Sequence, residues 1–262
     1  MTNDREARAL GFARVALGVI FLARTFPRLG WPTPDWTVPV TGLALPAGIV
    51  ASLCIVRTGA AVLFTCGVRA RLAGIIAAAS GYVVLAQDRF AFINSLHILF
   101  LATFVLALTS APSAVALVPD RSVPPEIVGS SVRFLAVILA SIYFWAGLAK
   151  VQPEWLSGHA LEVQTHAGAF AGVLGPLLEH AAVRAVASWT VPAVELFVAL
   201  LLLADRRRLA IVLGLGFHAV VELTVHPDTL GWQMAVLLLA IWPRATRLAG
   251  SAPPVASAPH EP

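Results

Sequence analysis

Long apolar stretches recur along the whole chain, and short groups of proline, glycine and charged residues separate them. A helix needs about 20 apolar residues to cross a hydrocarbon core of about 30 Å, so these stretches are typical of membrane-spanning helices. The pattern predicts about eight spans, at 7–26, 45–66, 69–86, 92–110, 129–149, 186–204, 209–226 and 229–243. We therefore expect an all-α polytopic membrane protein.

One connection differs from the others in length and in polarity. The segment 152–184 interleaves glutamate, glutamine and histidine with leucine, valine and phenylalanine. It is too long for a simple turn and too polar to span, which predicts one or two amphipathic helices in the outer membrane interface. Residues 1–248 then form one transmembrane domain, and the Ala/Pro/Ser-rich tail 249–262 is predicted to be disordered.

Composition supports the membrane prediction. The chain is 58% hydrophobic and 12% charged, with a mean hydropathy of +0.83, whereas soluble domains carry about 25% charged residues. The net charge of +4 comes mostly from arginines at the ends of spans. That distribution indicates membrane orientation and argues against nucleic-acid binding.

The arginines also predict the orientation in a plasma or inner membrane. If eight spans alternate, four arginine groups fall on one side, at 5–8, 69–71, 206–208 and 244–247. The positive-inside rule places that side, and both termini, in the cytoplasm. The end of the fifth span, at Lys150, then lies at the outer face.

Lys150 is the most informative single residue. Of 18 basic residues, one is lysine and 17 are arginine. A desolvated ammonium can lose its proton, whereas a guanidinium in practice cannot, so a lone lysine at the end of an apolar span suggests acid–base chemistry. The alternative is a lysine that extends along the helix end to reach water.

The sequence around Lys150 carries a motif. Residues 143–150 read Y-F-W-A-G-L-A-K, and Trp155 and Gly158 follow. This segment resembles the core motif of the vitamin K-dependent γ-glutamyl carboxylases and of the wider horizontally transferred transmembrane (HTTM) family, aromatic-F-x-A-G-x-x-K followed by W and G. The resemblance implies that Lys150 is the base that deprotonates a vitamin K-type hydroquinone.

Three shorter matches accompany this motif in the order that the family has. They are G-F-A-R at 11–14, N-x-x-H at 94–97 and F-H at 217–218, so the resemblance covers about residues 10–243. It implies that His97 orients the amine of Lys150, and that residues around the cavity bind quinone or substrate. The candidates for that binding are Asn94, Arg14, Tyr143, Trp155 and His218. His97 and His218 have the alternative of hydrogen-bonded interior histidines.

Charged residues inside spans need partners, because an isolated buried charge is costly. Arg57 and Glu195 both lie near the middle of their spans, which predicts a structural ion pair between them. Arg14 either joins a structural pair or binds an anionic headgroup or carboxylate. We predict no metal site, since no cysteine or histidine cluster has zinc spacing.

The resulting functional expectation is a membrane-embedded enzyme with carboxylase-like or quinone-epoxidase-like chemistry. Its cofactors would be a reduced quinone with O2 and CO2, and its substrate a peptide or a small molecule. The alternative is a non-catalytic quinone- or lipid-binding or transporter-like subunit. In either case a separate extracytoplasmic soluble protein or peptide is the expected partner, beside the lipid bilayer itself.

Overall fold

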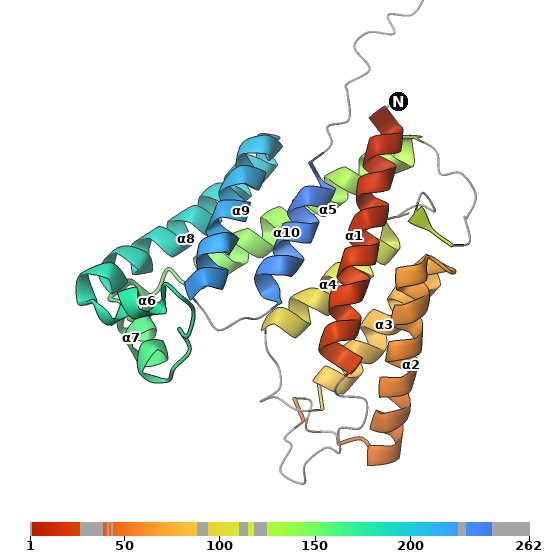
Figure 1. The fold of residues 1–262 in the computed structure, drawn as a ribbon, viewed down its shortest axis with the longest axis horizontal. Helices are drawn as coiled ribbons and strands as arrows, with labels where there is room; N and C mark the ends of the chain where they lie inside the picture. Colours follow the sequence, from red (N-terminus) through yellow and green to blue (C-terminus); the bar gives the residue numbers. More distant parts are fainter. Residues whose placement is uncertain are drawn as a thin grey trace, which may run out of the picture.

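The structure is a computed structural model that describes residues 2–26, 39–40, 42, 44–87, 94–109, 115–117, 125–224 and 229–242. Helices make up its regular structure, and no β-strand occurs within these ranges (Figure 1). The all-α prediction is therefore confirmed. The long helices are α1 (Thr2–Thr25), α2 (Ala47–Cys66), α3 (Ala70–Leu85), α4 (Asn94–Leu108), α5 (Pro125–Leu148), α8 (Ala181–Leu203), α9 (Arg207–Thr224) and α10 (Leu230–Ala240).

Each of these helices coincides with one predicted apolar stretch, but they differ in their capacity to cross a bilayer. Three described helical segments are long and apolar enough to span, namely Ala47–Cys66, Glu126–Leu148 and Ala181–Leu203. The apolar segments of α3, α4 and α10 are shorter than the ~20 residues that a hydrocarbon core requires. The structure thus supports a helical membrane protein with three clear candidate spans, fewer than the eight predicted.

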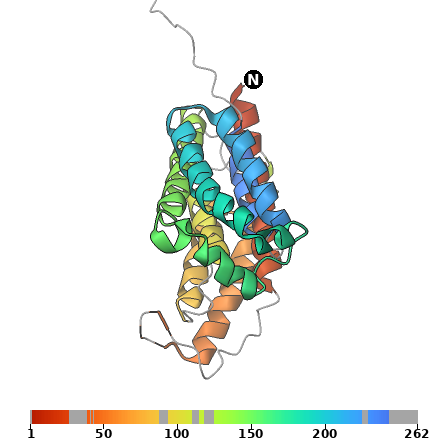
Figure 2. The same cartoon turned by 90° about the vertical axis from the view of Figure 1, so that its left-hand side faces the viewer.

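The helices form one bundle in which α1 is central. Helix α1 packs against α2, α4, α5 and α10, while α3 lies between α2 and α4. On the other side α8 packs against both α5 and α9, as Figure 2 shows. Close approach within the first group depends on small residues. A Cβ at Gly74 would lie 2.6 Å from Ala107 and one at Gly81 would lie 2.8 Å from Phe100, as is typical of membrane helix packing.

Large apolar side chains also cover the outside of the bundle. Trp145 and Trp189 are each 63% exposed, and Leu200 on α8 is 60% exposed. Soluble monomers rarely expose apolar patches of this extent. The outward apolar surface is what a helical bundle in lipid requires.

The polar connection between α5 and α8 is helical, as predicted. It contains α6 (Pro153–Leu156), α7 (His159–His166) and the 3₁₀ helix η3 (Gly175–Glu179), and α8 begins at Ala181 rather than at the predicted 186. Figure 1 places α6 and α7 at the left-hand side of the bundle, beside the start of α8. The position of the connection 152–184 in the outer membrane interface stays a prediction.

Hydrogen bonds fix this connection to the bundle. The amides of Gly172 and Leu174 donate to the last carbonyl oxygens of α9, on Thr224 and Leu223, at 3.0 and 2.7 Å. These contacts satisfy carbonyls that have no partner within the helix. Arg184 on α8 adds a second attachment, because its guanidinium donates to the carbonyl oxygens of residues 178 and 179 and to the carboxylate of Glu162. The connection is therefore attached to the ends of two helices. The tail 249–262, predicted to be disordered, lies outside the described residues.

Candidate functional site

Lys150 lies just after the last turn of α5 and forms an ion pair with Glu195 of α8. Its Nζ donates to Glu195 Oε1 at 2.9 Å, to Oε2 at 2.8 Å and to the carbonyl oxygen of Ala146 at 3.0 Å. The side chain of Glu195 is 8% exposed and that of Lys150 is 24% exposed. Because one Nζ donates to both carboxylate oxygens, the pair holds both groups in one geometry.

A close helix contact brings the two charges together. Gly147 lies one turn before Lys150, and a Cβ there would meet Leu196 Cγ at 2.8 Å and the carbonyl oxygen of Pro192 at 3.1 Å. Glu195 lies on the same part of α8, between these two contacts. Because Gly147 has no side chain, α5 and α8 approach closely enough for the lysine to reach the carboxylate.

Trp155 adds an aromatic group and an unused donor beside the ion pair. The Nζ of Lys150 lies 5.6 Å from the centroid of the Trp155 ring, within cation–π range. The indole Nε1 of Trp155 is buried and has no hydrogen-bond acceptor among the described residues. A buried N–H without an acceptor is costly in a native structure. This donor is therefore available to a ligand oxygen.

Tyr143 and His218 form a second polar contact deeper in the bundle. The Tyr143 hydroxyl and His218 Nε2 lie 2.8 Å apart, joining α5 to α9. Gly214, one turn before His218, leaves room for this hydroxyl, since a Cβ there would lie 3.2 Å from it. Tyr143, Gly147 and Lys150 are spaced by four and three residues, so they share one face of α5.

The side chains of Lys150, Tyr143, Glu195 and His218 form one band across α5, α8 and α9. Lys150, which binds Glu195, lies two turns along α5 from Tyr143. The other ring nitrogen of His218, Nδ1, is buried without a partner among the described residues. Three of the predicted site residues, Lys150, Tyr143 and His218, thus lie in this band together with Glu195. Trp155 lies beside Lys150, at one end of this band.

His97 does not join Lys150, contrary to the prediction. Its Nδ1 lies 3.2 Å from the hydroxyl of Tyr82 on α3, and the same hydroxyl donates to the carbonyl oxygen of His97 at 3.0 Å. Helix α4 carries His97 toward α3, whereas Lys150 faces α8. The expectation that His97 orients the amine of Lys150 is therefore corrected: this amine binds Glu195 instead. Asn94 is the first residue of α4, and its side chain lies outside the described residues.

The predicted ion pair between Arg57 and Glu195 is also wrong. Both carboxylate oxygens of Glu195 accept from Lys150, and Arg57 donates to the carbonyl oxygen of Thr25 at 3.3 Å. The two residues lie on helices with different neighbours, because α2 packs against α1 and α3 while α8 packs against α5 and α9.

Arg14 is completely buried away from the Lys150 site. Its guanidinium donates to the carbonyl oxygen of Val115 at 2.9 Å. Nε and one terminal nitrogen have no hydrogen-bond partner among the described residues. Its contacts lie at the C-terminal end of α2, where a Cβ on Gly67 would lie 2.7 Å from the guanidinium. Such a position suits a cation, because helix C-terminal ends carry partial negative charge.

The sequence offered one signal for these contacts that the prediction did not use. The chain has two tyrosines, and each forms a hydrogen bond to a histidine within a predicted span. Glu195 was recognised as an embedded charge but assigned to the wrong partner. Tyr82 was not predicted as a site residue.

Comparison with known families agrees with the motif around Lys150. The family model of the HTTM domain matches residues 3–243. No curated protein and no solved structure matches the chain significantly. The match spans α1 to α10, including all the residues of the band. The chain therefore belongs to the HTTM domain family.

Proposed function

We propose that the protein is a membrane-embedded enzyme in which Lys150 acts as the base that deprotonates a reduced quinone. The observation that carries this proposal is the ion pair of Lys150 with Glu195 at the end of an apolar helix. In the proposed topology all eight helices span the membrane, both termini are cytoplasmic, and the Lys150 site opens to the outer side.

Glu195 gives the lysine a way to become a neutral base. The pair shares one proton, and a low-dielectric surrounding narrows the free-energy difference between the charged pair and the neutral pair. When the proton lies on the Glu195 carboxyl, the amine of Lys150 is free to accept a proton from a hydroxyl. The new ammonium then stands beside the anion that it has created, so the net charge of the site does not change.

The residues around the pair fit a hydroquinone. Lys150 and the unpartnered indole N–H of Trp155 can bind an oxygen on the ring, and the Trp155 ring supplies an apolar aromatic surface. The hydroquinone supplies the electrons that reduce O2, as the family resemblance implies. Modification of a peptide or small substrate, with CO2 as a second reactant, and a separate soluble partner belong to the same proposal.

Oxygen uptake by the purified protein tests the proposal. Menadiol, a vitamin K-type hydroquinone, is supplied in detergent micelles, and the menadiol-dependent rate is compared for wild type, Lys150→Ala, Lys150→Arg and Glu195→Gln. Loss of a general base lowers a rate by about 10²–10⁴-fold. We expect that loss for both lysine variants, because arginine keeps the charge but cannot serve as the base.

Arg71→Gln is the control, since Arg71 is an exposed residue near the start of α3 and far from Lys150 along the fold. It should retain the wild-type rate. Equal rates in wild type and both lysine variants would refute the proposal. Tight menadiol binding without turnover would instead favour a non-catalytic quinone-binding subunit in which Lys150 and Glu195 form a structural ion pair.

A further inference from the structure

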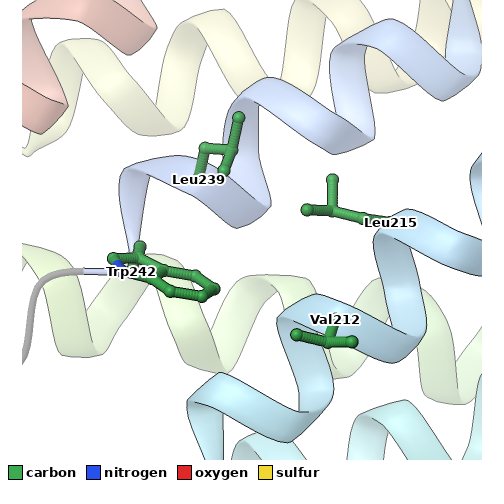
Figure 3. A pocket seen from close by; sticks show the side chains of 4 residues that line it. All are labelled: Val212, Leu215, Leu239 and Trp242. Atoms are coloured by element: carbon green, nitrogen blue, oxygen red, sulfur yellow. The ribbon is translucent and has the colours of Figure 1, made fainter.

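An apolar groove lies between α9 and α10, away from Lys150. Val212 and Leu215 of α9 and Leu239 and Trp242 at the end of α10 line a pocket of about 540 Å³ (Figure 3). Val212 is 59% exposed and Leu239 is 52% exposed, so the groove opens on the outside of the bundle. In a membrane this surface contacts lipid, and a concave site of this size can hold an acyl chain.

One end of the groove carries a positive charge. Arg208 is exposed and precedes Val212 by four residues and Leu215 by seven. This spacing places Arg208 on the same face of α9, one turn closer to the start of the helix. The charge of Asp205 in the preceding turn is offset by Arg207, whose Nε lies 2.8 Å from its carboxylate.

Trp242 adds a polar group at the same end. It follows the last turn of α10, and its ring extends from there toward α9 near Val212 (Figure 3). Indole rings favour the interface between acyl chains and headgroups, because the ring is apolar and the N–H needs a polar partner. The groove therefore combines an apolar slot with a cation and a hydrogen-bond donor at one end.

From this combination we infer that the groove is a binding site for an anionic phospholipid. One acyl chain lies along Val212, Leu215 and Leu239, and the phosphate lies between Arg208 and Trp242. The chemistry distinguishes this lipid from a zwitterionic one, because the headgroup of an anionic lipid brings no cation of its own to oppose Arg208. A purely apolar groove would not discriminate between the two.

This site is independent of the proposed function. The groove lies in the first half of α9, whereas His218 and the capped C-terminal end of α9 lie in the second half, beside the connection that follows Lys150. In Figure 1 the start of α9 is at the upper end of that helix, and α6 and α7 lie near its opposite end, at the left-hand side of the bundle. Failure of either proposal leaves the other intact.

Lipid titration of the full chain tests the inference. The protein in mild detergent is titrated with dioleoyl phosphatidylglycerol and, separately, with dioleoyl phosphatidylcholine, and bound lipid is counted by native mass spectrometry. Arg208→Gln removes the charge at the groove. Arg206→Gln removes the same charge from the exposed turn before α9, off the groove face. Val212→Trp fills the slot without changing any charge.

An arginine near an anionic headgroup contributes binding that corresponds to about a five-fold change in affinity. We expect Arg208→Gln to weaken phosphatidylglycerol binding about five-fold, with phosphatidylcholine unchanged, and Arg206→Gln to change neither. Val212→Trp should weaken both lipids. Equal affinity of wild type for the two lipids, an equal effect of both arginine variants, or unchanged binding in Val212→Trp would each overturn the inference.

Discussion

The ion pair between Lys150 and Glu195 makes a quantitative prediction about stability. Replacing Lys150 with methionine keeps an unbranched side chain, shorter by the amine, but leaves the Glu195 carboxylate 8% exposed and without its donor. Breaking a buried pair by removing one partner costs about 3–5 kcal/mol, because the remaining charge is uncompensated. We expect Lys150→Met to lower the free energy of unfolding by an amount in that range.

Glu195→Gln should be milder. The glutamine can still accept a hydrogen bond, the ammonium keeps the carbonyl oxygen of Ala146, and the side chain of Lys150 is 24% exposed and can reach water. We expect a loss of about 1–2 kcal/mol, in the range of a weakened hydrogen bond to a charged group. The double variant Lys150→Met/Glu195→Gln has no buried charge at this site. It should be more stable than Lys150→Met alone.

The three variants and wild type form a double-mutant cycle. Reversible unfolding in mixed dodecyl maltoside and dodecyl sulfate micelles, followed by helical circular dichroism, gives the four free energies. We expect a coupling of about 2 kcal/mol, within the range for groups in direct contact. If the two single effects summed to the effect of the double variant within about 0.5 kcal/mol, the two residues would be energetically independent and the ion pair would be refuted.

The helix contacts lead to three further predictions. Gly147→Ala forces α5 and α8 apart and should destabilise the protein by about 1–3 kcal/mol in thermal unfolding. The control Gly129→Ala, with open space around its Cβ on the same helix, should be neutral or stabilising, and equal effects of the two variants would contradict the close contact. Tyr143→Phe leaves a buried ring nitrogen of His218 without its 2.8 Å partner and should cost about 1–3 kcal/mol in the same assay, so an unchanged stability would argue against this hydrogen bond. Arg184→Ala removes the donor to the carbonyl oxygens of residues 178 and 179 and to the carboxylate of residue 162. Limited proteolysis should then cut the chain within 159–180 at least several-fold faster, and an unchanged rate would show that these contacts are dispensable.

The positions of the helices could be predicted from the sequence because their signals are local. The apolar stretch 45–66 ends at Gly67, which adopts φ 77° as the C-cap of α2, and the predicted span 209–226 differs from α9 by only two residues at each end. Polarity and length likewise indicated that 152–184 forms short helices. The motif around Lys150 indicated the family, which the match over residues 3–243 confirms.

The pairing of side chains could not be predicted in the same way, because it depends on which helices are neighbours. Depth along the span placed Glu195 level with Arg57, but α8 packs against α5 and not beside α2. The same difficulty affected His97, whose face on α4 meets Tyr82 of α3 rather than Lys150. Hydrophobic periodicity defines the buried face of a helix and contains no information about the identity of the helix that covers it.

Removal of a proton from a hydroquinone by Lys150 can be measured directly. The absorbance spectrum of menadiol bound to the protein without oxygen reports it, since the hydroquinone and its anion absorb differently. Wild type should show the anion spectrum at neutral pH, whereas Lys150→Arg and Lys150→Ala should bind menadiol but show the spectrum of the neutral form. An anion spectrum that persists in both variants, or that is absent from menadiol-saturated wild type, would show that Lys150 is not the base.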